Sequence, residues 1–171
     1  MTIKKLDVLS VDFDWIISLK HQEELLRYII PIVYRHDDIY LGYTHDKIYP
    51  LFEHGYDEYN IYNIDHHHDF GYEKFQNLDE GNWLFHLANV FTHKINYTWI
   101  SNPTSDHVYW INTKMHKLKS FMFDHNINYI RETNFDKIFL CCSPDHAIAK
   151  EAVVAYKIVE SIVNENKKSE S

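Results

Sequence analysis

Two short acidic motifs, each at the end of an apolar run, are the residues of this chain best suited to chemistry. The first is the triplet Asp65, His67 and Asp69, which follows a run that ends at Ile64. In an extended strand the side chains alternate between faces, so these three side chains are expected to point the same way. Two carboxylates and one imidazole on one edge are suitable ligands for manganese, iron or zinc.

A second pair of carboxylates lies near the N-terminus. Asp12 and Asp14 are two residues apart and also follow an apolar run, and a lone histidine, His45, follows another strand-like segment. Two metal ions that share a site lie about 3.5–4 Å apart and need several anionic ligands, one of them bridging. Four aspartates and two histidines meet that need, so the sequence predicts a binuclear metal site.

Each motif also has a structural interpretation. Asp12 and Asp14 are suited to cap turns at a strand end, and residues 44–46 are suited to begin a helix. His66 and His68 alternate with the triplet, so we expect them to face away from the metals. Four clustered carboxylates without cations would repel one another and raise each other's pKa values, which favours the metal interpretation if the strands converge.

The elements that must position these residues alternate along the chain. Strand-like runs cover residues 6–13, 38–44, 60–65, 95–100 and 137–142, and helical patterns cover 22–34, 79–92 and 145–165. Residues 121–130 are compatible with a sixth strand. This alternation predicts an α/β fold of three layers, α/β/α, with a mostly parallel sheet in a single domain over residues 1–171.

Ligands of such sheets bind beyond the carboxyl ends of the strands. The acidic motifs and His45 all follow strand-like runs, so we expect them to converge on one edge of the sheet. Asp145 and His146 follow the last run and are expected to reach the same edge.

Composition excludes several other classes. The net charge of −8 comes with no basic stripe, which disfavours nucleic-acid binding. No run approaches the roughly 18–20 apolar residues of a membrane span, and the first apolar stretch is too short for a signal peptide. Cys141 and Cys142 are adjacent in an apolar run, where thiols behave as small hydrophobes, and their pattern fits a reducing cytoplasm.

The motifs resemble those of the arginase-like ureohydrolases. The triplet is similar to that family's Asp-x-His-x-Asp motif, residues 10–14 to its Ser-Phe-Asp-x-Asp element, and His45 to its lone histidine. In arginases the aspartate pair follows the triplet, whereas here it precedes it, and this chain is far shorter. Both features, together with Cys-Ser-Pro-Asp at residues 142–145, resemble a smaller family that includes the peptide arginases.

This resemblance implies a hydrolase with two manganese ions that converts arginine within a peptide or protein to ornithine and urea. It implies six metal ligands, with Asp12 and Asp65 bridging: Asp12, Asp14, His45, Asp65, His67 and Asp69. Arginases carry a proton-shuttle histidine shortly after the triplet, but here that region contains Glu80 and no histidine before His86. The candidate catalytic residues are therefore Asp145, which suits a guanidinium cation, with His146 and Glu80.

Two other function classes stay open. One is a different metallohydrolase with the same metal geometry, such as a deacetylase or a phosphoesterase. The other is a non-catalytic relative that binds a ligand or a protein partner. Metal content separates the last class from the first two, and urea release separates a ureohydrolase from the rest. The sequence does not indicate the oligomeric state.

Overall fold

A computed structural model of the chain describes residues 2–71, 77–105, 113–131, 133–143, 145, 147 and 149–169. Within these residues one six-stranded sheet has the order β2-β6-β1-β3-β4-β5, and all neighbouring strands are parallel. The strands are β1 (Lys5–Asp12), β2 (Ile39–Leu41), β3 (Glu58–Ile64), β4 (Ile95–Ile100), β5 (Ser120–Asp124) and β6 (Lys137–Cys141). The α-helices are α1 (Leu19–Val33), α2 (Trp83–Val90) and α3 (Lys150–Ser169). Short 3₁₀ helices are η1 (Phe13–Trp15), η2 (His45–Leu51), η4 (Thr113–Lys117) and η5 (Ile127–Ile130).

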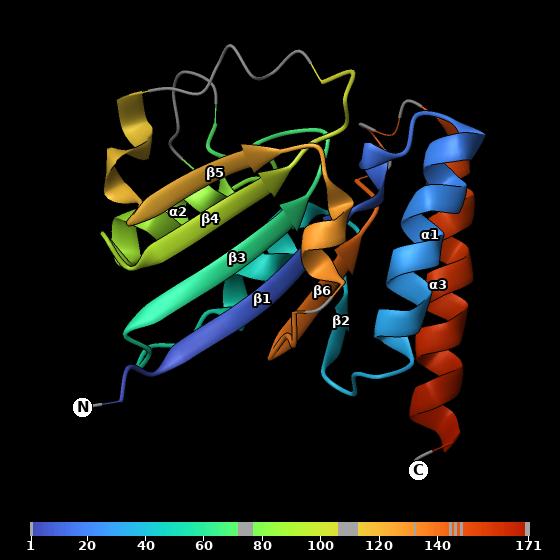
Figure 1. Cartoon of the computed structure of the whole chain (residues 1–171), viewed down its shortest axis with the longest axis horizontal. Coiled ribbons are helices and arrows are strands. Elements are labelled where there is room, and N and C mark those ends of the chain that lie inside the picture. The colour runs from blue at the N-terminus through green and yellow to red at the C-terminus, as the bar shows by residue number, and fades with distance from the viewer. Residues whose placement is uncertain are drawn as a thin grey trace.

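Helices cover both faces of the sheet, which confirms the predicted three-layer α/β fold. Helices α1 and α3 lie side by side on one face (Figure 1), and α2 packs with η2 on the other. A hydrophobic core lies on each face of the sheet, and successive residues of β1 pack into them alternately. Val8 packs on the α2 side and Leu9 on the side of α1 and α3. The central strands are therefore apolar on both faces, as expected for a covered parallel sheet.

The order of the strands makes β1 a topological switch point. From β1 the chain passes to β2 on one side of this strand and then returns to β3 on the other. Ligands of open α/β sheets bind at such points, beyond the carboxyl ends of the strands. The arrowheads in Figure 1 all point toward the same edge, and both acidic motifs follow strands that end there.

Several element boundaries differ from the sequence-based prediction. Strand β3 ends at Ile64, so the triplet lies beyond it, and β2 has only three residues, after which the chain bends at residues 43 and 44. Residues 120–124 do form the sixth strand, but η5 follows it at Ile127. Helix α1 continues through Pro31 to Val33, and the helix predicted from residue 145 begins at Lys150.

Gly42 brings the end of β2 close to β6. Its N–H donates to the carbonyl oxygen of Leu140 over 2.9 Å. A Cβ atom at this position would lie 2.7 Å from Cζ of Phe139 and 3.2 Å from Cβ of Lys47. The Phe139 ring stacks on the imidazole of His45, with ring centroids 5.9 Å apart. The missing side chain at residue 42 therefore leaves room for the ring that supports His45.

We predict that Gly42→Ala lowers the free energy of unfolding by about 1–3 kcal/mol, the usual effect of overpacking a core. Chemical denaturation followed by circular dichroism measures it. If the overlap with Phe139 is the cause, a double-mutant cycle with Phe139→Leu should give losses that are less than additive. An Ala variant as stable as the wild type would contradict the close approach at this position.

Candidate metal centre

The carboxyl end of β1 supplies the first two carboxylates. Asp12 is the last residue of β1 and Asp14 lies in η1, and the two residues are 2% and 1% exposed. The N–H of Asp14 donates to Oδ1 of Asp12 over 3.1 Å, so Asp12 caps the short helix as the structural interpretation anticipated. The capping role uses Oδ1 and leaves Oδ2 of Asp12 facing the other donors.

His45 begins η2 and is also fully buried, so the helix-start and the metal interpretations apply to the same residue. Its Nε2 lies 2.5 Å from the hydroxyl of Ser10. The opposite ring nitrogen, Nδ1, lies 2.8 Å from Oδ2 of Asp69, 2.9 Å from Oδ2 of Asp65 and 3.7 Å from Oδ2 of Asp12. Ser10 therefore fixes the orientation of the ring so that Nδ1 faces three carboxylates.

The triplet converges by a different route from the one predicted. Strand alternation does not orient it, because β3 ends at Ile64 and residues 65–67 form a bend. The N–H of His67 donates to Oδ1 of Asp65 over 2.7 Å. Asp69 adopts a left-handed backbone conformation with φ of 53°, which aspartate tolerates better than most residues. The bend and the left-handed conformation of Asp69 bring the side chains of His67 and Asp69 each within reach of Asp65, in two separate groups.

His67 connects the triplet to the motif on β1. Its Nδ1 lies 3.0 Å from Oδ2 of Asp14 and 3.6 Å from Oδ1 of Asp65. Its side chain is 22% exposed, whereas the other five predicted ligands are almost completely buried. This part of the centre therefore faces the surface.

Five of the six predicted ligands form two donor groups that have Asp65 in common. One group consists of His45, Asp65 and Asp69, and the other of Asp14, Asp65 and His67. In each group the ligand atoms lie within 4.8 Å of one another. Asp12, the sixth predicted ligand, lies beside His45, with its Oδ2 atom 3.7 Å from Nδ1 of that ring. We call these six residues the donor cluster: Asp12, Asp14, His45, Asp65, His67 and Asp69.

Neighbouring polar hydrogens hold the carboxylates in place. Nε1 of Trp83 donates to Oδ2 of Asp69 over 2.6 Å, and the hydroxyl of Ser143 donates to Oδ2 of Asp12. Nδ2 of Asn63 lies 3.3 Å from Oδ2 of Asp65 and 3.4 Å from Oδ2 of Asp69. Hydrogen bonds of this kind orient metal ligands.

Sequence reasoning missed the role of these neighbours. From the sequence, Trp83 is expected to be an apolar residue of a helix, and Asn63 an ordinary residue of a strand. The one available signal is that the N–H of a buried tryptophan usually needs a hydrogen-bond acceptor.

The two histidines interleaved with the triplet lie outside both donor groups. His66 and His68 are buried. The Nδ1 atom of His68 accepts a hydrogen bond from the N–H of Phe70 over 3.1 Å, and its ring packs edge-on against Trp99. His66 contributes its backbone N–H to Oδ1 of Asp14 over 3.3 Å. Both histidines therefore support the bend that carries the ligands.

The two predicted catalytic residues that the structure describes, Asp145 and Glu80, are not part of these donor groups. Asp145 is exposed and follows β6, and Glu80 is half-buried in the turn before α2. His146 lies outside the described residues. The role of all three residues remains a prediction.

The charges of the donor cluster are strongly coupled. Burial, and then the charge of Asp65, raises the pKa of Asp69 to about 8. Burial lowers the pKa of His67, but its contacts with Asp14 and Asp65 outweigh this and raise it to about 11. Burial opposes the charged form of His45, but contact with Asp69 and Asp65 outweighs it and raises the pKa of His45. Burial likewise opposes the charged form of Asp65, but the two imidazoles outweigh it and lower the pKa of Asp65. At neutral pH the imidazole of His67 therefore carries a proton when no cation is bound.

The donor cluster fits a pair of cations. Nδ1 of His45 and Oδ2 of Asp14 are buried and make no hydrogen bond, although carboxylate or imidazole atoms lie within 3.0 Å of each. Buried polar atoms without a hydrogen bond are rare in folded proteins. Because both atoms point into the donor cluster, a bound cation is the partner that their chemistry suits best.

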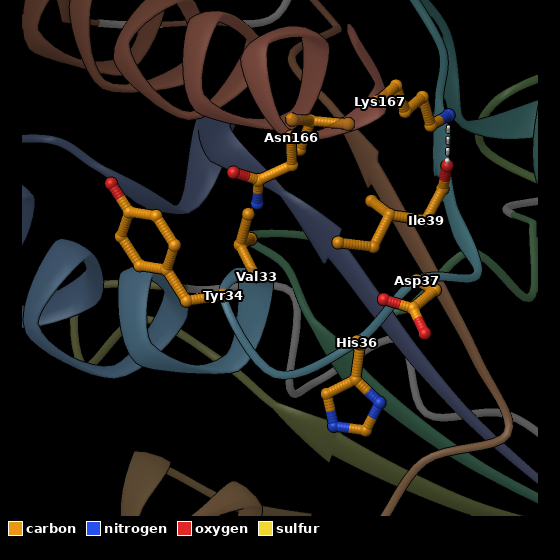
Figure 2. A pocket seen from close by; sticks show the side chains of 8 residues that line it. Val33, Tyr34, His36, Asp37, Ile39, Asn166 and Lys167 are labelled. Atoms are coloured by element: carbon orange, nitrogen blue, oxygen red, sulfur yellow. Dashed lines mark hydrogen bonds between the residues drawn. The ribbon is translucent and has the colours of Figure 1, made fainter. Parts of the chain in front are cut away.

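A separate pocket lies at the opposite edge of the sheet (Figure 2). Its volume is about 220 Å³, and it lies between the end of α1, the start of β2 and the end of α3. Nζ of Lys167 donates to the carbonyl oxygen of Ile39 over 2.9 Å at its wall. Among the described residues, the groups of side chains that could hold a metal all lie at the other edge.

No helix in the described part of the chain is long and apolar enough to cross a membrane.

We predict that His67→Ala lowers the number of bound manganese ions by about one per chain. The substitution removes the only imidazole from the donor group of Asp14, Asp65 and His67. His66→Ala is the matched control, since the backbone N–H that it gives to Asp14 is kept in the variant. Elemental analysis after manganese loading and desalting measures both. Retention of metal by His67→Ala together with its loss from His66→Ala would reverse the assignment.

We also predict that manganese affinity rises with pH between pH 6 and 8. The pKa of His67, at about 11, lies above this window, so its imidazole holds a proton that a metal ion must displace, and the pKa of His45 is shifted in the same direction. Each proton released makes the affinity rise about tenfold per pH unit. Calorimetric titration in buffers of different ionisation enthalpy measures affinity and proton release together. An affinity independent of pH would contradict the protonation described above.

No family of known proteins, no curated protein and no solved structure matches this chain. The geometry of the donor cluster is therefore the basis on which a function can be assigned.

Proposed function

We propose that this chain is a hydrolase with two manganese ions that acts on the guanidinium group of arginine, presented by a peptide or protein. The observation that carries the proposal is that Asp65 belongs to both donor groups. A carboxylate reachable from two adjacent sites is the feature that a two-metal centre requires. A single structural ion would need only one of these groups.

The charge and type of the ligands favour two divalent manganese ions. The four carboxylates balance the charge of two divalent cations, and both imidazoles become neutral once their protons leave. Carboxylate oxygens with a minority of imidazole nitrogens suit manganese.

The proposed chemistry is hydrolysis of a carbon–nitrogen bond to give ornithine and urea. A bound metal pair supplies a hydroxide at neutral pH by lowering the pKa of a water molecule. Asp12 and Asp65 are the bridging ligands by resemblance to arginases. Trp83 and Ser143 hold one oxygen each of Asp69 and Asp12, which keeps the ligand positions fixed. Asp145, exposed beyond the same sheet edge, is the proposed partner of the guanidinium cation.

A peptide substrate suits this chain better than free arginine. Free arginine needs loops that bind its α-amino and α-carboxylate groups, whereas the motifs resemble those of the peptide arginases, which act on arginine within a peptide. Both cysteines are free and buried, which fits the reducing cytoplasm as the proposed location.

The test is to incubate manganese-loaded protein with arginine-containing peptides. We expect mass spectra to show conversion of arginine to ornithine, with an equal amount of urea released. Free arginine should react more slowly than the peptides. Asp65→Asn removes the shared carboxylate charge and should lower turnover by at least about 10²-fold, since it disturbs both metal positions.

Two controls separate the possible failures. A peptide with lysine in place of arginine should stay unchanged, because it offers no guanidinium carbon. Metal analysis of the same sample shows whether the centre is loaded. Protein that holds two manganese ions but releases no urea from any peptide would overturn the guanidinium assignment and favour another metallohydrolase.

A further inference from the structure

The thiol of Cys141 lies next to two members of the donor cluster, Asp12 and His45. Cys141 is the last residue of β6 and is in register with Asp12 on the neighbouring strand β1. Its Sγ atom, a carboxylate oxygen of Asp12 and a ring nitrogen of His45 lie within 4.8 Å of one another. All three side chains are buried, so this third group of donors is shielded from water.

The adjacent cysteine lies on the other face of the sheet. Cys141 packs in the core on the α2 side, together with Trp83 and Phe139. Cys142 packs in the core beneath α1 and α3. Strand alternation thus separates two neighbouring thiols that the sequence alone treats as equivalent, and only Cys141 faces the donor cluster.

The histidine of this third group has a buried ring nitrogen that makes no hydrogen bond, Nδ1. It faces carboxylate oxygens of Asp69, Asp65 and Asp12 at 2.8, 2.9 and 3.7 Å. Its other ring nitrogen is engaged by Ser10. A nitrogen in this position, beside an oxygen and a sulfur, matches the ligand types that zinc and cadmium accept.

We propose that Cys141, Asp12 and His45 form a binding site for a thiophilic divalent cation such as Zn²⁺ or Cd²⁺. The thiol binds as a thiolate and its proton passes to water, so no oxidant or reductant is involved. Because Asp12 and His45 also belong to the donor cluster, such a cation competes with manganese for shared ligands. The proposal rests on the metal centre and does not depend on arginine as the substrate.

Titration of the metal-free full chain with cadmium tests this site. Thiolate bound to cadmium gives an ultraviolet charge-transfer absorption that oxygen and nitrogen ligands do not give. We expect the band in the wild type and in Cys142→Ala, and its loss in Cys141→Ala. Both variants remove one buried sulfur, so Cys142→Ala controls for the loss of packing. A band that survives in Cys141→Ala, or that is absent from wild-type protein, would overturn the proposal.

A measurement on the wild type alone guards against misfolding of the variants. X-ray absorption at the cadmium edge should show a sulfur neighbour in the cadmium-loaded chain, and a shell of only oxygen and nitrogen would contradict the site. Manganese added beforehand should shift the cadmium titration to higher concentrations. A cadmium–sulfur signal in a chain that releases no urea would leave this inference standing while the guanidinium assignment fails.

Discussion

The burial of four carboxylates in one small space is the constraint on which the rest of the structure depends. Burying an ionised carboxylate away from water costs free energy unless the charge is paired. Repulsion between neighbouring carboxylates raises that cost further. Burial and mutual repulsion raise the pKa values of Asp12, Asp14 and Asp69. The two imidazoles compensate in part, and a pair of divalent cations would compensate fully. The chain therefore maintains an arrangement that is unfavourable for stability alone, which is common where function requires it.

Elements of the central sheet hold the donor cluster. Its ligands lie at the end of β1, just beyond β1 and β3, and in the first turn after β2. Trp83 and Phe139 surround the imidazole of His45 with apolar rings, while Trp83 also donates its N–H to Asp69. The left-handed conformation of Asp69 is maintained by these contacts. Packing and ligand orientation are thus provided by the same side chains.

Much of the fold was predictable from the sequence because its signals are local. Apolar runs rich in β-branched and aromatic residues marked the strands, and residues 95–100 form β4 as predicted. The convergence of the six ligands followed from one rule about the carboxyl ends of parallel strands. The bend at residues 65–67 and the separate faces of Cys141 and Cys142 depend on where strands end and pack. Those are tertiary properties, and periodicity alone does not encode them.

The central claim is that two metal ions share Asp65 within the donor cluster. Electron paramagnetic resonance of the wild-type chain, loaded with increasing amounts of manganese, tests it directly. The account predicts that the spectrum of isolated ions gives way to that of an exchange-coupled pair as loading approaches two ions per chain, since bridged ions interact magnetically. Spectra of isolated ions at every loading, or manganese that remains free in solution, would contradict it.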